Sequence, residues 1–277
     1  MQIPKIQQKC NPNFHAGLTK QLKSEALSCD INKIVREFEK NNIVADFKNN
    51  KMLAWCSIKT FEIIKTLRKN FRLNLGLPNG IVVEDFNKLR IDNPEADAFC
   101  NSVPTHLYFD KDVVVPHNTV FFNECKELNS GQGNEYWNQI NEIADWEYEM
   151  GESPTNSFLY TFLHEFSHVI HNSNIIDLYG GENYINIVLK ALDNDFLKSF
   201  QDKYGKIALQ LCNYAAYSPF EGVACDLGKR LSQDLDEKTL IPTKNSLKGS
   251  PYLKRTINPN DSEYNQLMTR LFNGDFE

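Results

Sequence analysis

The apolar positions between residues 158 and 171 recur at the spacing of an α-helix. They form one wide stripe, which consists of Phe158, Leu159, Phe162, Leu163, Phe166, Val169 and Ile170. The opposite stripe is polar and consists of Ser157, Thr161, His164, His168 and His171. This pattern predicts a helix whose back is buried and whose front presents histidines. Pro154 and Thr155 precede the apolar run and the polar segment 172–174 follows it, so we expect the helix to begin and end at these signals.

The same kind of pattern divides the rest of the chain into short strands and helices. We expect helices over residues 31–41, 56–71, 137–150, 184–192, 196–217, 219–233 and 262–272. We expect strands over residues 43–47, 81–85, 106–109, 113–115 and 119–123. Residues 1–22 are expected to form an irregular arm and residues 240–259 an extended crossing, while residues 86–104 show no assignable pattern.

These elements predict an α+β fold in which a small mixed sheet packs on the 158–171 helix and a mainly helical C-terminal lobe follows. The whole chain, residues 1–277, fits a single domain. Within it we expect an N-terminal lobe over residues 23–172, with the sheet and the histidine-bearing helix, and a helical C-terminal lobe over residues 173–277.

Composition narrows the class of protein without identifying it. The net charge is −6 and no basic block stands out, so we expect no nucleic-acid partner. No stretch approaches about 18 consecutive apolar residues, and residues 1–17 lack the apolar core of a signal peptide, so we expect no membrane partner. The seven cysteines form no C-x-x-C pair and are expected to be free thiols. We therefore expect a monomer that is cytoplasmic, or exported without a cleavable signal peptide.

The polar stripe contains the pattern H-E-x-x-H, between His164 and His168. Two histidines four residues apart on a helix lie one turn apart on the same face. Two neutral imidazoles can then reach one metal ion, with Zn–N distances of about 2.0–2.1 Å. Glu165 lies on the flank of this face, from where it can accept a proton from a water molecule that the metal activates. The alternative is a chance pattern formed by two histidines that have partners in the core.

A catalytic zinc takes three protein ligands, so a third residue must come from elsewhere in the chain. His171 shares the helix face, but a third bond from two turns of the same helix is awkward. Glu221 is the better candidate and lies in the first turn of the helix expected at 219–233. Ser218, Pro219 and Glu221 also fit a capping box with proline at the first helical position. The two interpretations are compatible, since a carboxylate in the first turn of a packed helix can face a metal.

The sequence HEFSH on an apolar helix, followed some fifty residues later by a tyrosine-rich segment and Glu221-x-x-Ala224, resembles the glutamate zincins, or gluzincins. Over residues 155–234 the chain looks most similar to the catalytic domain of the anthrax toxin lethal factor-like metallopeptidases. The resemblance implies a zincin-like fold and a zinc metallopeptidase. It also implies that His164, His168 and Glu221 bind Zn²⁺ and that Glu165 is the general base.

A tyrosine seven residues before the ligand glutamate stabilises the oxyanion in that family, and Tyr214 stands at this spacing from Glu221. Tyr217 competes with Tyr214 for the role, and either can instead belong to the core. Many gluzincins also carry an acid four residues after the ligand glutamate, which braces a histidine. This chain has Cys225 at that place and Asp226 one residue further on, so the group that braces the histidine is open.

The expected substrate is a peptide or protein that enters in an extended form and pairs with a sheet edge, for which the strand at 119–123 is the candidate. Two alternatives to a peptidase stay open. One is a metal-binding interaction domain without turnover, and the other is a zinc hydrolase that acts on a non-peptide amide. Glu165 argues against the first alternative, because a purely structural zinc site has no need of it.

Overall fold

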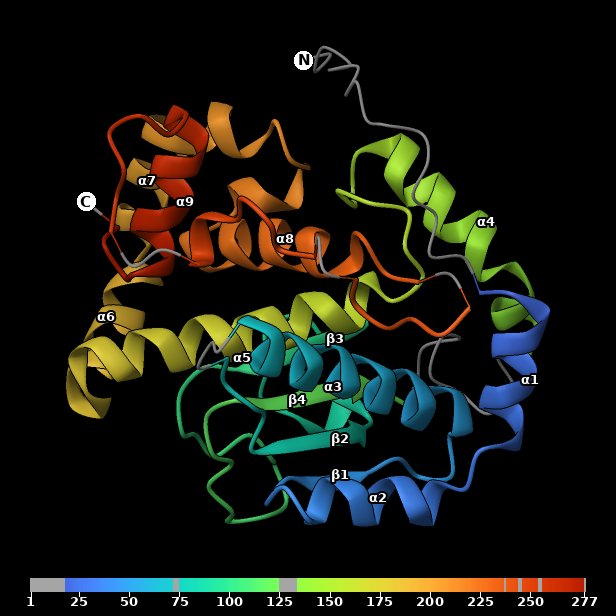
Figure 1. Cartoon of the computed structure of the whole chain (residues 1–277). Helices are drawn as coiled ribbons and strands as arrows, with labels where there is room; N and C mark the ends of the chain where they lie inside the picture. The colour runs from blue at the N-terminus through green and yellow to red at the C-terminus, as the bar shows by residue number, and fades with distance from the viewer. Residues whose placement is uncertain are drawn as a thin grey trace.

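Short apolar strands pair into one sheet, and amphipathic helices cover it and extend beyond it (Figure 1). The structure is a computed structural model that describes residues 18–71, 75–124, 134–236, 238–243, 246–253 and 256–276. The strands are β1 (Val44–Asp46), β2 (Gly80–Glu84), β3 (Ala98–Asn101) and β4 (Thr119–Asn123). The α-helices are α1 (Lys20–Ser28), α2 (Ile31–Glu39), α3 (Lys51–Phe71), α4 (Asn134–Met150), α5 (Tyr160–Tyr179), α6 (Gly181–Ala191), α7 (Asn194–Ala208), α8 (Pro219–Ser232) and α9 (Glu263–Phe272). The 3₁₀ helices are η1 (Phe86–Lys88), η2 (Tyr214–Ala216) and η3 (Pro251–Leu253).

The strand order in the sheet is β1-β2-β4-β3. β1, β2 and β4 run parallel, and β3 pairs with β4 in the antiparallel direction. The strand expected at 119–123 is β4, and it lies inside the sheet between β2 and β3. Our expectation that it forms the sheet edge is therefore wrong. The edge on that side is β3, which lies within the unassigned segment 86–104 and shows no alternation between buried and exposed residues.

The two faces of the sheet belong to different apolar clusters, as the alternation of side chains along a strand requires. Ile81 and its neighbour Val120 point into the main core, which the helices share. Phe122 of β4 meets Phe162 of α5 there, with ring centroids 4.8 Å apart. The intervening Phe121 points to the other face, into a small cluster with loop residues between β2 and β4. α5 thus packs on this face of the sheet and contacts both β4 and β3.

Most predicted helices and strands are present, with differences that follow from local packing. α1 begins inside the segment expected to be irregular, because Thr19 caps it and Leu22 and Ala26 are buried. Residues 1–17 of that predicted arm lie outside the described ranges. Residues 106–109 and 113–115 form isolated bridges rather than strands. The helix expected at 196–217 ends at Ala208 and is followed by the short η2.

The helix α5 continues well past the polar segment that was expected to end it. Asn172 and Asn174 are buried, yet both have hydrogen-bond partners outside the helix. The amide of Asn172 donates to Asn118 at 3.0 Å, and that of Asn174 donates to the carbonyl of Phe272 at 2.8 Å. Polar side chains with such partners do not compete with the helix backbone, so the helix runs on to Gly180, which has a positive φ of 81°.

The expected lobe boundary at residue 172 falls inside α5, so both proposed lobes share this helix. The division into lobes stays a prediction. Within the described ranges, no helix combines the length and the apolarity that crossing a bilayer would require.

α8 lies alongside α5, and this contact joins the C-terminal helices to the sheet (Figure 1). The two backbones lie close together at Gly228. A Cβ added there would lie 3.2 Å from both the Cα and the backbone nitrogen of His164. Backbone atoms in a packed helix cannot move aside cheaply, so the two helices can approach this closely because residue 228 has no side chain.

We expect Gly228→Ala to lower the free energy of unfolding by about 1–3 kcal/mol, because the added methyl group pushes α8 away from α5. Gly205→Ala in α7 is the matched control. A Cβ at Gly205 meets nothing within 4 Å, and alanine there should stabilise the protein by about 0.4–1 kcal/mol. Denaturant unfolding measures both values, and equal midpoints for Gly228→Ala and the wild type would show that the helix contact tolerates a methyl group.

Candidate metal centre

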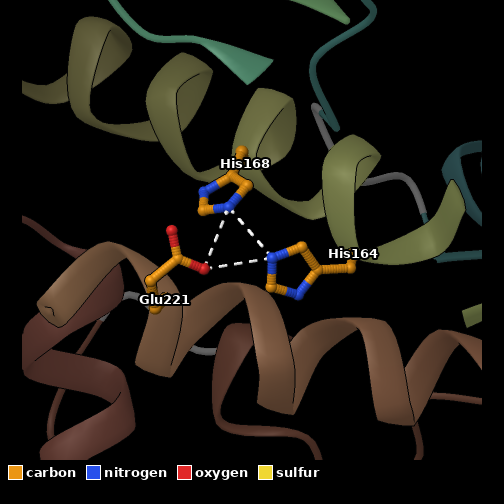
Figure 2. A group of neighbouring side chains, drawn as sticks. All are labelled: His164, His168 and Glu221. Carbon is orange, nitrogen blue, oxygen red and sulfur yellow. Dashed lines mark hydrogen bonds and ion pairs between the residues drawn. The ribbon is translucent and has the colours of Figure 1, made fainter. Parts of the chain in front are cut away.

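The side chains of His164 and His168 on α5 meet that of Glu221, which is distant in the sequence, between α5 and α8 (Figure 2). The Nε2 atoms of His164 and His168 lie 3.2 Å apart. The Oε2 atom of Glu221 lies 3.1 Å from Nε2 of His164 and 3.5 Å from Nε2 of His168. The two histidines are buried, and Glu221 is partly buried. The structure therefore brings together the three residues that the sequence suggested as ligands.

Local sequence explains how each helix presents its ligands. On α5 the i, i+4 spacing places both imidazoles on one face of the helix. The apolar stripe lies on the opposite face and packs on the sheet, so the histidine face points away from the sheet. On α8 the hydroxyl of Ser218 accepts the backbone N–H of Glu221 at 3.1 Å, and Pro219 occupies the first turn. Ser218 thus caps the helix as predicted, while the carboxylate of Glu221 is directed at the histidines.

The atoms that converge here leave hydrogen-bonding capacity unused. Glu221 Oε2 is buried, and within the described ranges no atom meets it with hydrogen-bond geometry, despite its short distances to both imidazoles. Buried polar atoms without partners are costly, and an acceptor pointing at two ring nitrogens suits a shared cation. These three residues could therefore hold a metal ion.

The charges of the group favour a cation at its centre. Burial alone would raise the pKa of Glu221, but the two histidines hold that pKa well below its usual range. Burial would lower the pKa of His168, yet the carboxylate of Glu221 raises it. Glu221 thus stays ionised and stabilises positive charge on its partners, whether a proton or a metal ion carries that charge.

Glu165 stands beside this group without belonging to it. Its side chain is buried, and its Oε2 atom has no hydrogen-bond partner among the described residues. Burial raises the pKa of Glu165; the neighbouring histidines oppose this effect and Glu221 adds to it. A buried carboxylate with a raised pKa beside a candidate cation site is suited to take up and release a proton.

Of the two candidate tyrosines, Tyr214 contacts the group. Its ring centroid lies 5.8 Å from that of His164, whereas the ring of Tyr217 packs on Tyr214 at 5.2 Å. The charge of Glu221, together with burial, raises the pKa of Tyr214 well above its ordinary value, so the phenol keeps its proton. Tyr214 is partly exposed, and its hydroxyl can therefore donate a hydrogen bond.

The other ring nitrogen of His164 has partners that the sequence did not reveal. Its Nδ1 atom lies 3.2 Å from the hydroxyl of Tyr160 and 3.8 Å from the sulfur of Cys225. Tyr160 precedes His164 by four residues, one turn earlier on the same helix face. This spacing was visible in the sequence, but a tyrosine at a helix start is too common to be singled out.

His171, the alternative third ligand, lies away from the group. Its Nε2 atom donates to the carbonyl of Leu271 at 2.9 Å, and its ring lies among Phe220, Phe272 and Phe276. Burial, which the Leu271 hydrogen bond only partly opposes, lowers the pKa of His171 to about 3. His171 is therefore a neutral core residue that ties α5 to α9.

The pKa of His171 predicts a component of the pH dependence of stability. In the unfolded chain His171 has the ordinary pKa of 6.5, so it binds a proton as the pH falls below that value. In the folded state the buried imidazole stays unprotonated down to its lowered pKa of about 3. Stability should therefore fall by up to about 1.4 kcal/mol per pH unit from His171 alone as the pH drops from about 6.5 toward 3. Denaturant unfolding at several pH values, with a chelator present, should show a shallower decline for His171→Phe. Identical pH profiles for the variant and the wild type would mean that His171 does not have this depressed pKa.

Comparisons with known proteins do not assign the chain to a family. No protein-family model, curated protein or solved structure that we compared with it matches. The candidate site is consequently defined by its own geometry and side-chain chemistry.

Proposed function

We propose that the protein is a zinc-dependent metallopeptidase. The observation that carries the proposal is the convergence of His164, His168 and Glu221 on one point. Their donor atoms are separated by 3.1, 3.2 and 3.5 Å. A tetrahedral ion with bonds of about 2.0–2.1 Å separates its ligands by about 3.3 Å, so the spacing suits an ion of this size and geometry.

The kind of donor favours zinc over other common ions. Ca²⁺ and Mg²⁺ prefer oxygen ligands, whereas two imidazoles and one carboxylate suit zinc. Three protein ligands leave a fourth position open, which is the arrangement of catalytic rather than structural zinc sites. A zinc ion held there would polarise a scissile carbonyl and lower the pKa of its bound water toward about 7.

The remaining side chains have roles that follow from their positions. Glu165 is the proposed general base, because it is buried beside the ligands and its raised pKa suits it to accept a proton and return it to the leaving amine. Tyr214 is the proposed donor to the oxyanion, because its protonated hydroxyl lies on a ring next to His164. These roles agree with those that the gluzincin resemblance implies, and a zincin-like fold belongs to the same proposal.

The proposed substrate is an extended peptide, and the position of β3 modifies where we expect it to pair. β3 is the outer strand next to α5, and its Cys100 is close enough to Glu165 and Glu221 for both carboxylates to raise the pKa of its thiol, which burial already raises. A peptide that adds to the open edge of β3 would therefore run past the metal ligands. This replaces the edge that the sequence suggested at residues 119–123.

Replacing the proposed general base should abolish turnover and leave the metal in place. We expect Glu165→Gln to lower peptide cleavage by about 10²–10⁴-fold, because the amide cannot accept the proton. Its zinc content should equal that of the wild type, while His168→Ala should lose zinc. Cleavage is measured on a peptide library by mass spectrometry, and metal content by elemental analysis.

Glu39→Gln on the exposed side of α2 is the control for loss of one negative charge, and it should cleave like the wild type. If Glu165→Gln cleaves peptides at the wild-type rate, the assignment of Glu165 as the general base is wrong. A zinc-loaded wild type that cuts no peptide, but unfolds more easily when zinc is removed, would favour the metal-stabilised interaction domain instead.

Tyr214 and Tyr217 form a matched pair for testing the oxyanion donor. Tyr214→Phe should lower kcat by about 10²–10³-fold, because it removes only the hydroxyl that meets the developing charge. Tyr217→Phe should retain activity, since that ring packs on Tyr214 rather than on the ligands. The assignment of Tyr214 is wrong if its variant keeps the wild-type kcat or if Tyr217→Phe alone loses it.

A further inference from the structure

A histidine that binds a metal through Nε2 carries its proton on Nδ1, and that proton needs an acceptor. In metal sites the acceptor is usually a carboxylate, a backbone carbonyl or a water molecule, and it fixes both the tautomer and the orientation of the ring. Around Nδ1 of His164 the structure places the hydroxyl of Tyr160 at 3.2 Å and the sulfur of Cys225 at 3.8 Å. The phenol oxygen is the closer and the stronger acceptor of the two.

The acid that follows Cys225 on α8 is not available for this role. Asp226 follows Cys225 directly, but its carboxylate accepts hydrogen bonds from Arg230, Tyr252 and Tyr264, each at 2.7 Å. These partners hold Asp226 on another side of α8, where it joins that helix to α9 and to η3. The groups that contact Nδ1 of His164 are therefore uncharged in their ordinary protonation states.

Two buried thiols lie on this side of α8. Cys225 is the one that approaches Nδ1 of His164, and Cys212 belongs to the same small apolar cluster as Cys225. A thiol sulfur is a weak acceptor, so neither competes strongly with the phenol oxygen for the Nδ1 proton.

Packing holds Tyr160 in this position. Its ring makes an edge contact with that of His164, with centroids 5.6 Å apart. α8 also packs on this ring, since a Cβ at Gly228 would lie in ordinary contact with Cε2 of Tyr160, at 3.4 Å.

We propose that Tyr160 is the positioning residue of His164, in the role that a carboxylate or a backbone carbonyl often has in metal sites. Its hydroxyl accepts the Nδ1 proton and so directs the Nε2 lone pair at the metal. The inference rests on the proposed function only in that the group binds zinc, and it does not depend on peptide cleavage.

Zinc affinity tests this role directly. Competition with a chromophoric chelator should give Tyr160→Phe a dissociation constant about 10–100-fold larger than that of the wild type, since the ring stays but the acceptor is lost. Tyr204→Phe is the matched control. Tyr204 is a mostly buried tyrosine on α7 whose hydroxyl accepts from Arg270 at 3.3 Å, away from the ligands, and its variant should bind zinc like the wild type.

A spectroscopic measurement on the wild type keeps the test decisive even if Tyr160→Phe does not fold. The zinc-loaded protein, labelled at histidine nitrogen, should show an Nδ1 proton of His164 that exchanges slowly with water and has a nuclear Overhauser contact to the Tyr160 ring.

Absence of that proton, or unchanged zinc affinity in folded Tyr160→Phe, would overturn the inference while leaving the proposed peptidase intact. If the wild type binds zinc but cuts no peptide, the proposed function fails and the role of Tyr160 is still decided by affinity. If the wild type binds no zinc, both proposals are wrong.

Discussion

The close packing of α8 against α5 is the contact on which the candidate site depends. α5 brings two imidazoles to one face, but two ligands from a single helix do not close a metal site. The carboxylate of Glu221 reaches them only because α8 crosses within contact distance of the backbone at His164, where Gly228 leaves room. A helix pair that was further apart would leave the Glu221 carboxylate out of reach of both histidines.

The same contact explains the electrostatic character of the site. Burial by itself disfavours a charged Glu221 and a charged His168, yet each offsets part of the cost for the other. The compensation is incomplete, because the Glu221 oxygen that points at the ring nitrogens lacks hydrogen-bond geometry with them. Three donor atoms held this close together could hold a metal ion between them.

Around the three candidate ligands, several buried polar groups have partners in neighbouring elements. His171 donates to a backbone carbonyl of α9, and Asp226 accepts from three side chains. These hydrogen bonds fix α5, α8 and α9 relative to one another without placing further charge at the ligands. The surroundings of His164, with a phenol and a thiol, continue this pattern.

The sequence alone determined the helix periods, the i, i+4 pair of histidines and the cap at Ser218, because these are properties of residues close together in the chain. It also suggested Glu221, since a capped helix start is a local signal. The tertiary structure decided what depends on distant neighbours. It showed β3 at the sheet edge, continued α5 through Asn172 with a partner 54 residues away and turned His171 into the core. Hydrogen bonds between remote segments override local signals in each of these cases, and no pattern within one segment records them.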